Sequence, residues 1–259
     1  MESRRYGFRP GFPGGGHWIT PAIKELFFLS TGIFLAQTVA QIVMPGAEIW
    51  IFRNLGLVPY DVVFRGRLWQ PLTYIFLHGD LWHLLINMLM LWMFGCDLER
   101  AWGRVRFYRY YLITGVGAAA CIVLIKFAAS IGGIARSDIP TVGASGAIFG
   151  ILIAAAILFP DKQVWLFPLP VMLPMRAFVF IMGLIAFFGT LRSGGDGISH
   201  IAHLGGLLVG YLYLRRGSYF YRVRNTYSDW QRRRLMRRFE VYKRRHEDKP
   251  PSRPDDWVN

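Results

Sequence analysis

The chain has 259 residues, of which 53% are hydrophobic and only 18% are charged. Soluble domains usually carry about 25% charged residues, so this balance disfavours a soluble protein and points to a lipid bilayer. The formal net charge is +14, and much of the positive charge follows residue 214, in runs such as Arg232, Arg233 and Arg234. A basic segment directly beyond an apolar stretch is typical of a cytoplasmic flank that contacts anionic lipid headgroups. We therefore expect a lipid-binding tail and no nucleic-acid partner.

The first apolar run of the chain predicts a membrane anchor. Leu26 to Met44 is free of charge, long enough to span a bilayer, and ended by Pro45. No small-residue cleavage site follows it, so we interpret it as a retained anchor and not as a cleaved signal. Before it, residues 1–22 include a polar stretch rich in Gly and Pro and are predicted to form a flexible cytoplasmic tail.

Residues 46–79 are neither a clean span nor a polar loop. Aromatic residues such as Trp50 and Trp69 alternate with charged residues such as Arg65 and Arg67, and Gly and Pro interrupt the pattern. Aromatic residues interleaved with charge favour a structure at the membrane interface. Because long loops without periodicity tend to be functional, we expect this segment to contribute to function.

Five further apolar stretches complete a six-span pattern. Several are shorter than the usual length of about 20 residues, so hydropathy alone leaves their number open. Lys and Arg favour the segments that lie inside when the N-terminus is cytoplasmic, and six spans return the basic C-terminal segment to that side. We therefore predict an all-α polytopic membrane protein, with a six-span domain at 23–215 and a basic cytoplasmic tail at 216–259. The five stretches lie at about 81–95, 107–127, 143–159, 174–191 and 198–214.

Polar side chains inside apolar stretches are costly in hydrocarbon, so each one is a functional candidate. Ser145 lies in Gly143-Ala144-Ser145-Gly146, at the predicted start of the fourth span. A helix N-terminus offers unpaired N–H groups to developing negative charge, and small neighbours allow another backbone to approach. A serine packed at a small-residue helix contact explains the same pattern, so this motif alone is weak evidence for catalysis.

His203 lies in Ala202-His203-Leu204-Gly205-Gly206 on the sixth predicted span. Gly206 and Gly210 share its side of the helix and predict close approach to a neighbouring helix. A satisfied interior histidine would explain this residue taken alone, but the serine among small residues on another span favours a Ser–His pair. His200 lies three residues earlier and roughly shares the same face, so geometry leaves it open as the base.

His83 and Asn87 are four residues apart and therefore share one face of the second predicted span. Both side chains donate hydrogen bonds and neither carries negative charge, which suits a pair of oxyanion donors. A metal site made of His83, His200 and His203 is the rival interpretation, but no His-Glu-x-x-His motif or nearby carboxylate supports it. We expect no metal and no cofactor.

Three motifs together resemble the rhomboid family of intramembrane serine proteases. The family's second-span signature is similar to Phe76-Leu77-His78-Gly79-Asp80-Leu81-Trp82-His83-Leu84-Leu85-Ile86-Asn87-Met88. Its nucleophile motif is similar to Gly143-Ala144-Ser145-Gly146, and its catalytic-histidine motif to Ala202-His203-Leu204-Gly205-Gly206. The motifs follow the family's order over roughly residues 45–215. The three in register are specific, whereas any one of them would not be.

The resemblance implies a six-helix bundle with a membrane-embedded first loop and a Ser–His dyad without a third acid. Ser145 would be the nucleophile and His203 its general base. The backbone N–H of Ser145 and the side chains of His83 and Asn87 would hold the oxyanion, and Gly143 would leave room for the substrate backbone.

Other positions near the expected site follow the family's pattern or depart from it. Phe149, one turn after Ser145, is expected to pack on the catalytic histidine, although some members have Tyr there. Gln70 follows Trp69 where members often have Arg, so the Arg-based loop contact of the family is in question. We expect Gly146, Gly206 and Gly210 to be structural residues beside the site.

The resemblance implies an endopeptidase that cleaves transmembrane segments of membrane-protein substrates. The compact six-span form without an appended soluble domain favours a multi-pass protein of a bacterial inner membrane, and the distribution of Lys and Arg predicts that both termini are cytoplasmic. The alternative from another class is a non-catalytic rhomboid relative that binds membrane clients without cutting them. A small-solute transporter is a weaker alternative, because proton-coupled transporters usually need carboxylates at span centres and none is found there.

Overall fold

A computed structural model describes residues 18–131, 139–165, 171–192 and 200–215, together with Met236, Phe239 and Glu240. The predictions for the first 17 residues, and nearly all of those for the C-terminal tail, lie outside these described residues. The flexible-tail, lipid-contact and domain-boundary assignments therefore stay predictions.

Helices dominate the described chain, and each of the six predicted apolar stretches is helical. Between the first and second of these stretches, where an interfacial loop was predicted, the chain forms α2 (Ala47–Leu55), α3 (Pro59–Phe64), α4 (Gln70–Thr73) and the 3₁₀ turn η1 (Tyr74–Phe76). The six stretches form α1 (Pro21–Val43), α5 (Leu81–Met90) continued by the π-turn η2 (Leu91–Gly95) and α6 (Cys96–Trp102), α7 (Arg104–Ile131), α8 (Ser145–Leu158), α9 (Met175–Arg192) and α10 (His200–Arg215).

Three helical segments in the described part of the chain are long and apolar enough to cross a membrane. They are Pro21–Val43, Leu81–Trp102 and Arg104–Ala128. Ser145–Leu158 and Met175–Leu191 are shorter apolar helices. A membrane-spanning helix needs about 20 residues when it faces lipid along its whole length, so helix length alone leaves the number of spans open.

Two helix boundaries extend past the predicted apolar limits because charged side chains find partners there. The first helix begins at Pro21 and not at Leu26, and the second helical segment continues from residue 95 to Trp102. Glu99, which is 5% exposed, accepts hydrogen bonds from the Ala22 N–H at 3.0 and 3.1 Å. This carboxylate satisfies N–H groups at the start of α1 that have no partner within the helix.

The strict all-α prediction is wrong in one respect. Strands β1 (Gln163–Trp165) and β2 (Met172–Pro174) form a short antiparallel pair between α8 and α9. Each strand has only three residues, which is too short for an alternating pattern to stand out from the sequence.

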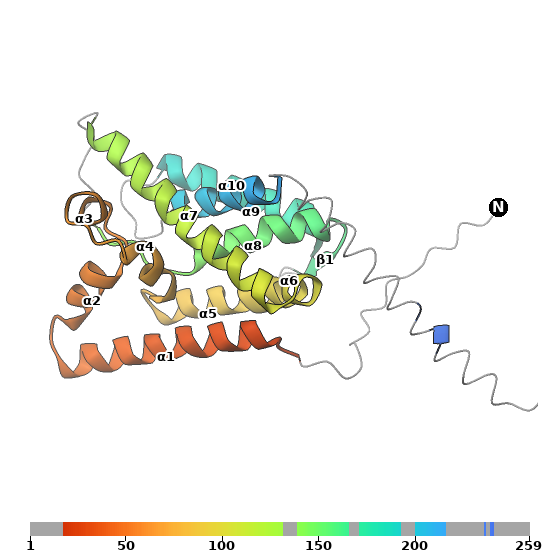
Figure 1. Ribbon diagram of the computed structural model, residues 1–259, viewed down its shortest axis with the longest axis horizontal. Helices are drawn as coiled ribbons and strands as arrows, with labels where there is room; N and C mark the ends of the chain where they lie inside the picture. Colours follow the sequence, from red (N-terminus) through yellow and green to blue (C-terminus); the bar gives the residue numbers. More distant parts are fainter. Residues whose placement is uncertain are drawn as a thin grey trace, which may run out of the picture.

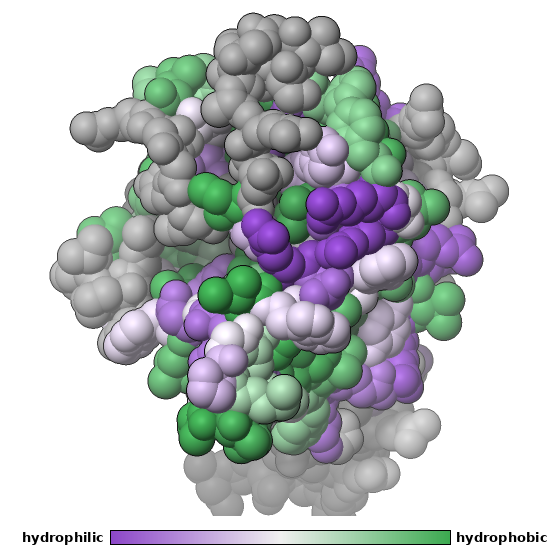
Figure 2. Space-filling model, turned by 90° about the vertical axis from the view of Figure 1, so that its left-hand side faces the viewer, coloured by the Kyte–Doolittle hydropathy of each residue, from purple (hydrophilic) through white to green (hydrophobic). Residues whose placement is uncertain are grey.

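The helices lie side by side with the short elements gathered at the ends (Figure 1). Helices α2, α3 and α4 lie at one end of the bundle, while α6 and β1 lie at the opposite end. Helix α8 begins inside the bundle, away from the end that carries α2 to α4. A view onto that end shows a band of hydrophilic side chains with hydrophobic side chains around it (Figure 2). The start of α8 is therefore set back from the end that carries this hydrophilic band.

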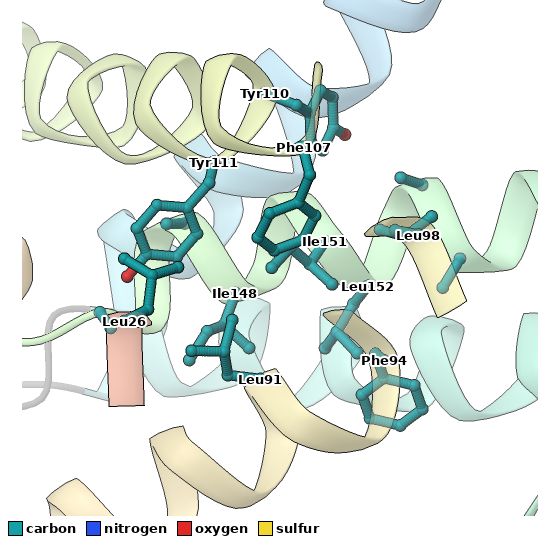
Figure 3. Close-up of a cluster of buried hydrophobic side chains, with 14 of the residues drawn as sticks. Leu26, Leu91, Phe94, Leu98, Phe107, Tyr110, Tyr111, Ile148, Ile151 and Leu152 are labelled. Carbon is teal, nitrogen blue, oxygen red and sulfur yellow. The ribbon is translucent and has the colours of Figure 1, made fainter. Parts of the chain in front are cut away.

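The core is built mainly from α5 to α8, whose large side chains interlock between helices. Phe94 from η2, Phe107 and Tyr111 from α7, and Ile148 and Ile151 from α8 are each at most 2% exposed (Figure 3). The outer surface is apolar as well, which is unusual for a soluble protein and typical of a lipid-facing one. On α1, for example, Leu35, Val39 and Ile42 are 58 to 78% exposed.

Helices α8 and α10 approach each other backbone to backbone. A Cβ on Gly206 would overlap the carbonyl group of Gly146, 2.9 Å from its carbon. One turn further, a Cβ on Gly210 would lie 3.1 Å from the Cα of Gly150. The predicted glycine face of the sixth span is thus a tight contact with the helix that begins at Ser145.

We predict that Gly206→Ala destabilises the protein by about 3 kcal/mol, because the added methyl meets a backbone carbonyl that cannot rotate away. Thermal unfolding in detergent measures the effect. Gly32→Ala on α1 is the matched control, since no atom lies within 4 Å of its added Cβ. Equal melting temperatures for the two variants would contradict the tight α8–α10 contact.

Candidate active site

The backbone that leads into Ser145 is fixed from two sides. Thr141 and Leu57 exchange both backbone hydrogen bonds at 2.9 Å. Gly143 has a φ of 122° and donates its N–H to the carbonyl of Tyr74 at 2.9 Å. Glycine tolerates this φ, which side-chain-bearing residues rarely adopt. Helix α8 then begins at Ser145, as predicted, with the first N–H groups free of intrahelical partners.

Ser145 and His203 face each other across the α8–α10 contact. The distance from His203 Nε2 to Ser145 Oγ is 2.9 Å, within hydrogen-bonding range, and both side chains are half-buried. His203 lies three residues before Gly206, so the glycine contact brings its helix close enough for this bond. A hydroxyl held against an imidazole in this way can lose its proton as it attacks an electrophile.

The His203 ring is oriented by packing on aromatic and imidazole rings. The Phe149 ring is parallel to it, with centroids 4.2 Å apart and planes inclined by 1°. The His200 ring meets it edge to face at 5.9 Å. In the described ranges no carboxylate hydrogen-bonds His203, so stacking sets the direction of its Nε2. The predicted contact of Phe149 with this histidine is present in the structure.

The structure separates the two histidines that the sequence left as rivals. A Cβ on Gly189 of α9 would lie 2.5 to 2.6 Å from three atoms of the His200 ring, so this ring packs on that glycine. His203, in contrast, reaches Ser145 Oγ. The geometry therefore favours His203 over His200 as the partner of the serine.

His83 and Asn87 line the other side of the Gly143 backbone. A Cβ on Gly143 would lie 2.6 Å from His83 Nε2 and 3.9 Å from Asn87 Nδ2. The Gly79 N–H donates to His83 Nδ1 at 3.5 Å, which leaves the ring proton on Nε2, the atom beside Gly143. Asn87 Nδ2 donates to the His83 carbonyl at 2.9 Å and keeps a second N–H. Both side chains can thus donate toward the segment that precedes Ser145.

The rival interpretation from the sequence was a metal site made of His83, His200 and His203. Among the described residues, no three His, Cys, Asp or Glu side chains lie close enough together to hold a metal ion. His83 instead faces Gly143, while His200 and His203 pack against each other. The arrangement is thus one hydroxyl, one imidazole in contact with it, and two neutral donors nearby.

Tyr74 and His78 were not identified as neighbours of the site from the sequence. The Tyr74 hydroxyl donates to the Gly115 carbonyl at 2.7 Å, while its own carbonyl holds Gly143. The fully buried His78 ring packs edge to face on His83 at 5.2 Å. No local motif marks Tyr74, because its contacts are with residues about 41 and 69 positions away and one of them uses only its backbone.

Comparison with known proteins identifies the family that this chain resembles over most of its helical region. The protein-family model described as the Rhomboid domain matches residues 65–219, more than half of the chain. "Rhomboid protein 1, mitochondrial" of Saccharomyces cerevisiae is 36% identical over 143 residues, which cover 53% of this chain and 38% of the relative. "RHOMBOID-like protein 1" of Arabidopsis thaliana is 30% identical over 195 residues, which cover 73% of this chain and 46% of the relative.

A bacterial relative is also similar. "Rhomboid protease AarA" of Providencia stuartii is 32% identical over 165 residues, which cover 59% of this chain and 57% of that protein. The chain thus spans between 38 and 57% of the length of these three relatives. The match of the family model to residues 65–219, on a helical chain with membrane-length apolar helices, shows that this protein belongs to the rhomboid family.

Proposed function

We propose that the protein is an intramembrane serine endopeptidase that cleaves transmembrane segments of membrane-protein substrates. The observation that carries the proposal is the 2.9 Å contact between Ser145 Oγ and His203 Nε2, inside a bundle of apolar helices. Membership of a family that includes proteins named as proteases supports it. The substrate class comes from the apolar, lipid-compatible outer surface of the described helices.

In the proposed mechanism His203 is the general base. Its Nε2 takes the proton from Ser145 Oγ as the oxygen attacks the scissile carbonyl, and an acyl-enzyme forms when the leaving amine receives that proton. Water then attacks the ester, again with proton transfer to His203, and releases Ser145. Stacking on Phe149 keeps the Nε2 atom aimed at the serine through both steps.

The proposed oxyanion site combines donors from two helices. The Ser145 N–H at the start of α8 and the side chains of His83 and Asn87 from α5 flank the Gly143 backbone. All of these donors are neutral, and they are in place before the reaction begins. Such preorganised donors stabilise developing negative charge without a reorganisation cost.

We further propose that six helical segments span the membrane and that both termini are cytoplasmic. Lys and Arg are enriched in the segments that this orientation places inside. The short α8 is compatible with a span because protein surrounds it: nine of its residues are buried. We propose a bacterial inner membrane as the location, with anionic headgroups as partners of the basic tail, in keeping with bacterial relatives such as AarA.

A non-catalytic, client-binding rhomboid relative is the alternative function. Such a protein has no need of a serine hydroxyl in contact with an imidazole, whereas this chain has both groups with a stacked aromatic ring behind the imidazole. This difference favours the protease.

We predict that Ser145→Ala and His203→Ala each lower the rate at which the protein cleaves a transmembrane reporter in liposomes by about 10⁴-fold or more. Both variants should also fail to react with a fluorophosphonate probe, because the nucleophile or its activation is lost. His200→Ala should retain labelling, since its ring packs on Gly189 rather than on the serine.

Each outcome bears on one assignment. Cleavage by Ser145→Ala or His203→Ala at the wild-type rate would refute the dyad. Labelling that is lost with His200→Ala but retained with His203→Ala would make His200 the base. A wild-type protein that binds the reporter without cleaving it or reacting with the probe would support the client-binding alternative.

We predict that His83→Ala and Asn87→Ala each lower kcat by about 100- to 1,000-fold, because each removes one oxyanion donor. KM should change little, since the developing oxyanion exists only in the transition state. Trp82→Ala is the control, because Trp82 is on the same helix, is 74% exposed, and contributes none of the atoms nearest to a Cβ on Gly143. An equal loss in the control, or a loss confined to KM, would argue against the oxyanion role.

A further inference from the structure

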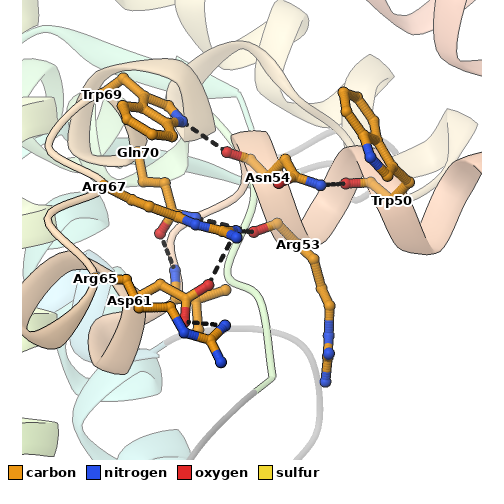
Figure 4. Close-up of polar contacts among 9 residues, drawn as sticks. Trp50, Arg53, Asn54, Asp61, Arg65, Arg67, Trp69 and Gln70 are labelled. Atoms are coloured by element: carbon orange, nitrogen blue, oxygen red, sulfur yellow. Dashed lines mark hydrogen bonds and ion pairs between the residues drawn. The ribbon is translucent and has the colours of Figure 1, made fainter.

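The side chain of Gln70 joins separate segments of the first loop. It is fully buried, its Oε1 accepts the Val58 N–H at 2.9 Å, and its Nε2 donates to the Arg53 carbonyl at 2.9 Å (Figure 4). When the oxygen and the NH₂ group of a buried amide both have hydrogen-bond partners, the loss of either bond costs stability, because it leaves a buried polar group unpaired. Gln70 therefore fixes the C-terminal part of α2 and the residue just before α3 onto the start of α4.

The segment that Gln70 holds leads directly to the backbone before Ser145. Leu57, adjacent to Val58, exchanges two backbone hydrogen bonds with Thr141, which lies two residues before Gly143. Gly143 in turn donates to the carbonyl of Tyr74, in the turn that follows α4. The segment before the serine is thus held at two points, and both lead back to the short stretch that begins with Gln70.

We propose that Gln70 is a positioning residue for the oxyanion site. By fixing Val58 it fixes Leu57 and Thr141, and through them the Gly143 backbone relative to His83. The Gly143 backbone and the His83 ring are closely packed, because a Cβ on Gly143 would lie 2.6 Å from His83 Nε2. A misplacement of about 1 Å in a preorganised site can cost about 100-fold in rate. The inference rests on the proposed function.

Of the two hydrogen bonds of the Gln70 amide, the one that Oε1 accepts from the Val58 N–H matters more for positioning this segment. The Arg53 carbonyl has a second donor, Arg67 Nη1 at 2.9 Å, and Arg67 also pairs with the 5% exposed Asp61 at 3.0 Å (Figure 4). The Val58 N–H is held by Gln70 Oε1. Glu at position 70 preserves that acceptor, with Arg67 nearby to balance its charge, whereas Met preserves only the volume.

The test compares three variants of the full chain in detergent. Gln70→Met should lower kcat by about 10- to 100-fold with KM unchanged, because the donors no longer match the transition state. Gln70→Glu should recover most of that loss. Asn54→Ala is the control: it removes an amide contact to the Trp50 carbonyl in the same loop, with no link to Thr141, and should keep the wild-type kcat.

Two further measurements separate positioning from a general loss of stability. In a His83→Ala background, Gln70→Met should lower kcat by less than about twofold, because residues that act as one unit give non-additive losses. Amide hydrogen exchange of residues 139–145 should be faster in Gln70→Met than in Asn54→Ala, whatever the activity.

The outcomes distinguish this inference from the proposed function. An inactive wild-type protein would refute the protease, while the exchange measurement would still decide the link from Gln70 to the segment before Ser145. Unchanged exchange in Gln70→Met would overturn the inference. So would a full, additive loss of kcat in the His83→Ala background, or a Glu variant as impaired as the Met variant.

Discussion

The close contact between α8 and α10 is the constraint on which the proposed site depends. Gly146 and Gly206 leave no room for a side chain between the two backbones, so the helices approach as closely as helices can. Ser145 precedes Gly146 by one residue and His203 precedes Gly206 by three. The 2.9 Å distance between Ser145 Oγ and His203 Nε2 is therefore a consequence of backbone packing as much as of side-chain choice. Such a distance is stable because neither helix can slide without a clash.

The first loop supplies the second constraint, which acts on the backbone before Ser145. Helices α2 to α4 are short and could not hold their shape alone. They are joined by side-chain-to-backbone bonds, such as those of Gln70, and by Thr73 Oγ1, which donates to the Leu55 carbonyl at 2.6 Å. The loop reaches the segment before Ser145 through the backbone pair of Leu57 and Thr141 and through the Tyr74 carbonyl, which accepts the Gly143 N–H. Its role in the site is thus to hold a backbone segment in place rather than to supply a reacting group.

Local patterns in the sequence were enough to locate the apolar helices and the start of α8. They also gave the glycine face of α10, because this feature depends on spacing within one helix, whereas the contact of Phe149 with His203 was expected only from the family resemblance. What could not be predicted depends on residues far apart in the sequence. Glu99 binds the start of α1 from 77 residues away, and Thr141 pairs with Leu57 through backbone atoms that carry no residue signature.

The spacing of His200 and His203, which are about one helical turn apart, also could not identify which ring contacts the serine. Both lie on α10 and roughly share a face, so their spacing is equally compatible with contact to a serine. Which ring reaches Ser145 depends on Gly189 of α9, a glycine whose missing side chain gives His200 a place to pack. That neighbour belongs to another helix, and its effect emerges only when the helices are assembled.

The absence of a carboxylate hydrogen-bonded to His203 among the described residues has a physical rationale in a membrane. A carboxylate behind the imidazole would place a permanent charge in a low-dielectric bundle, which is expensive unless it is fully paired. Stacking on the Phe149 face and contact with the His200 edge orient the ring at no such cost. In the proposed mechanism every group of the site is neutral at rest, and charge appears only while the serine reacts. In that mechanism the donors beside Gly143 would stabilise this transient negative charge.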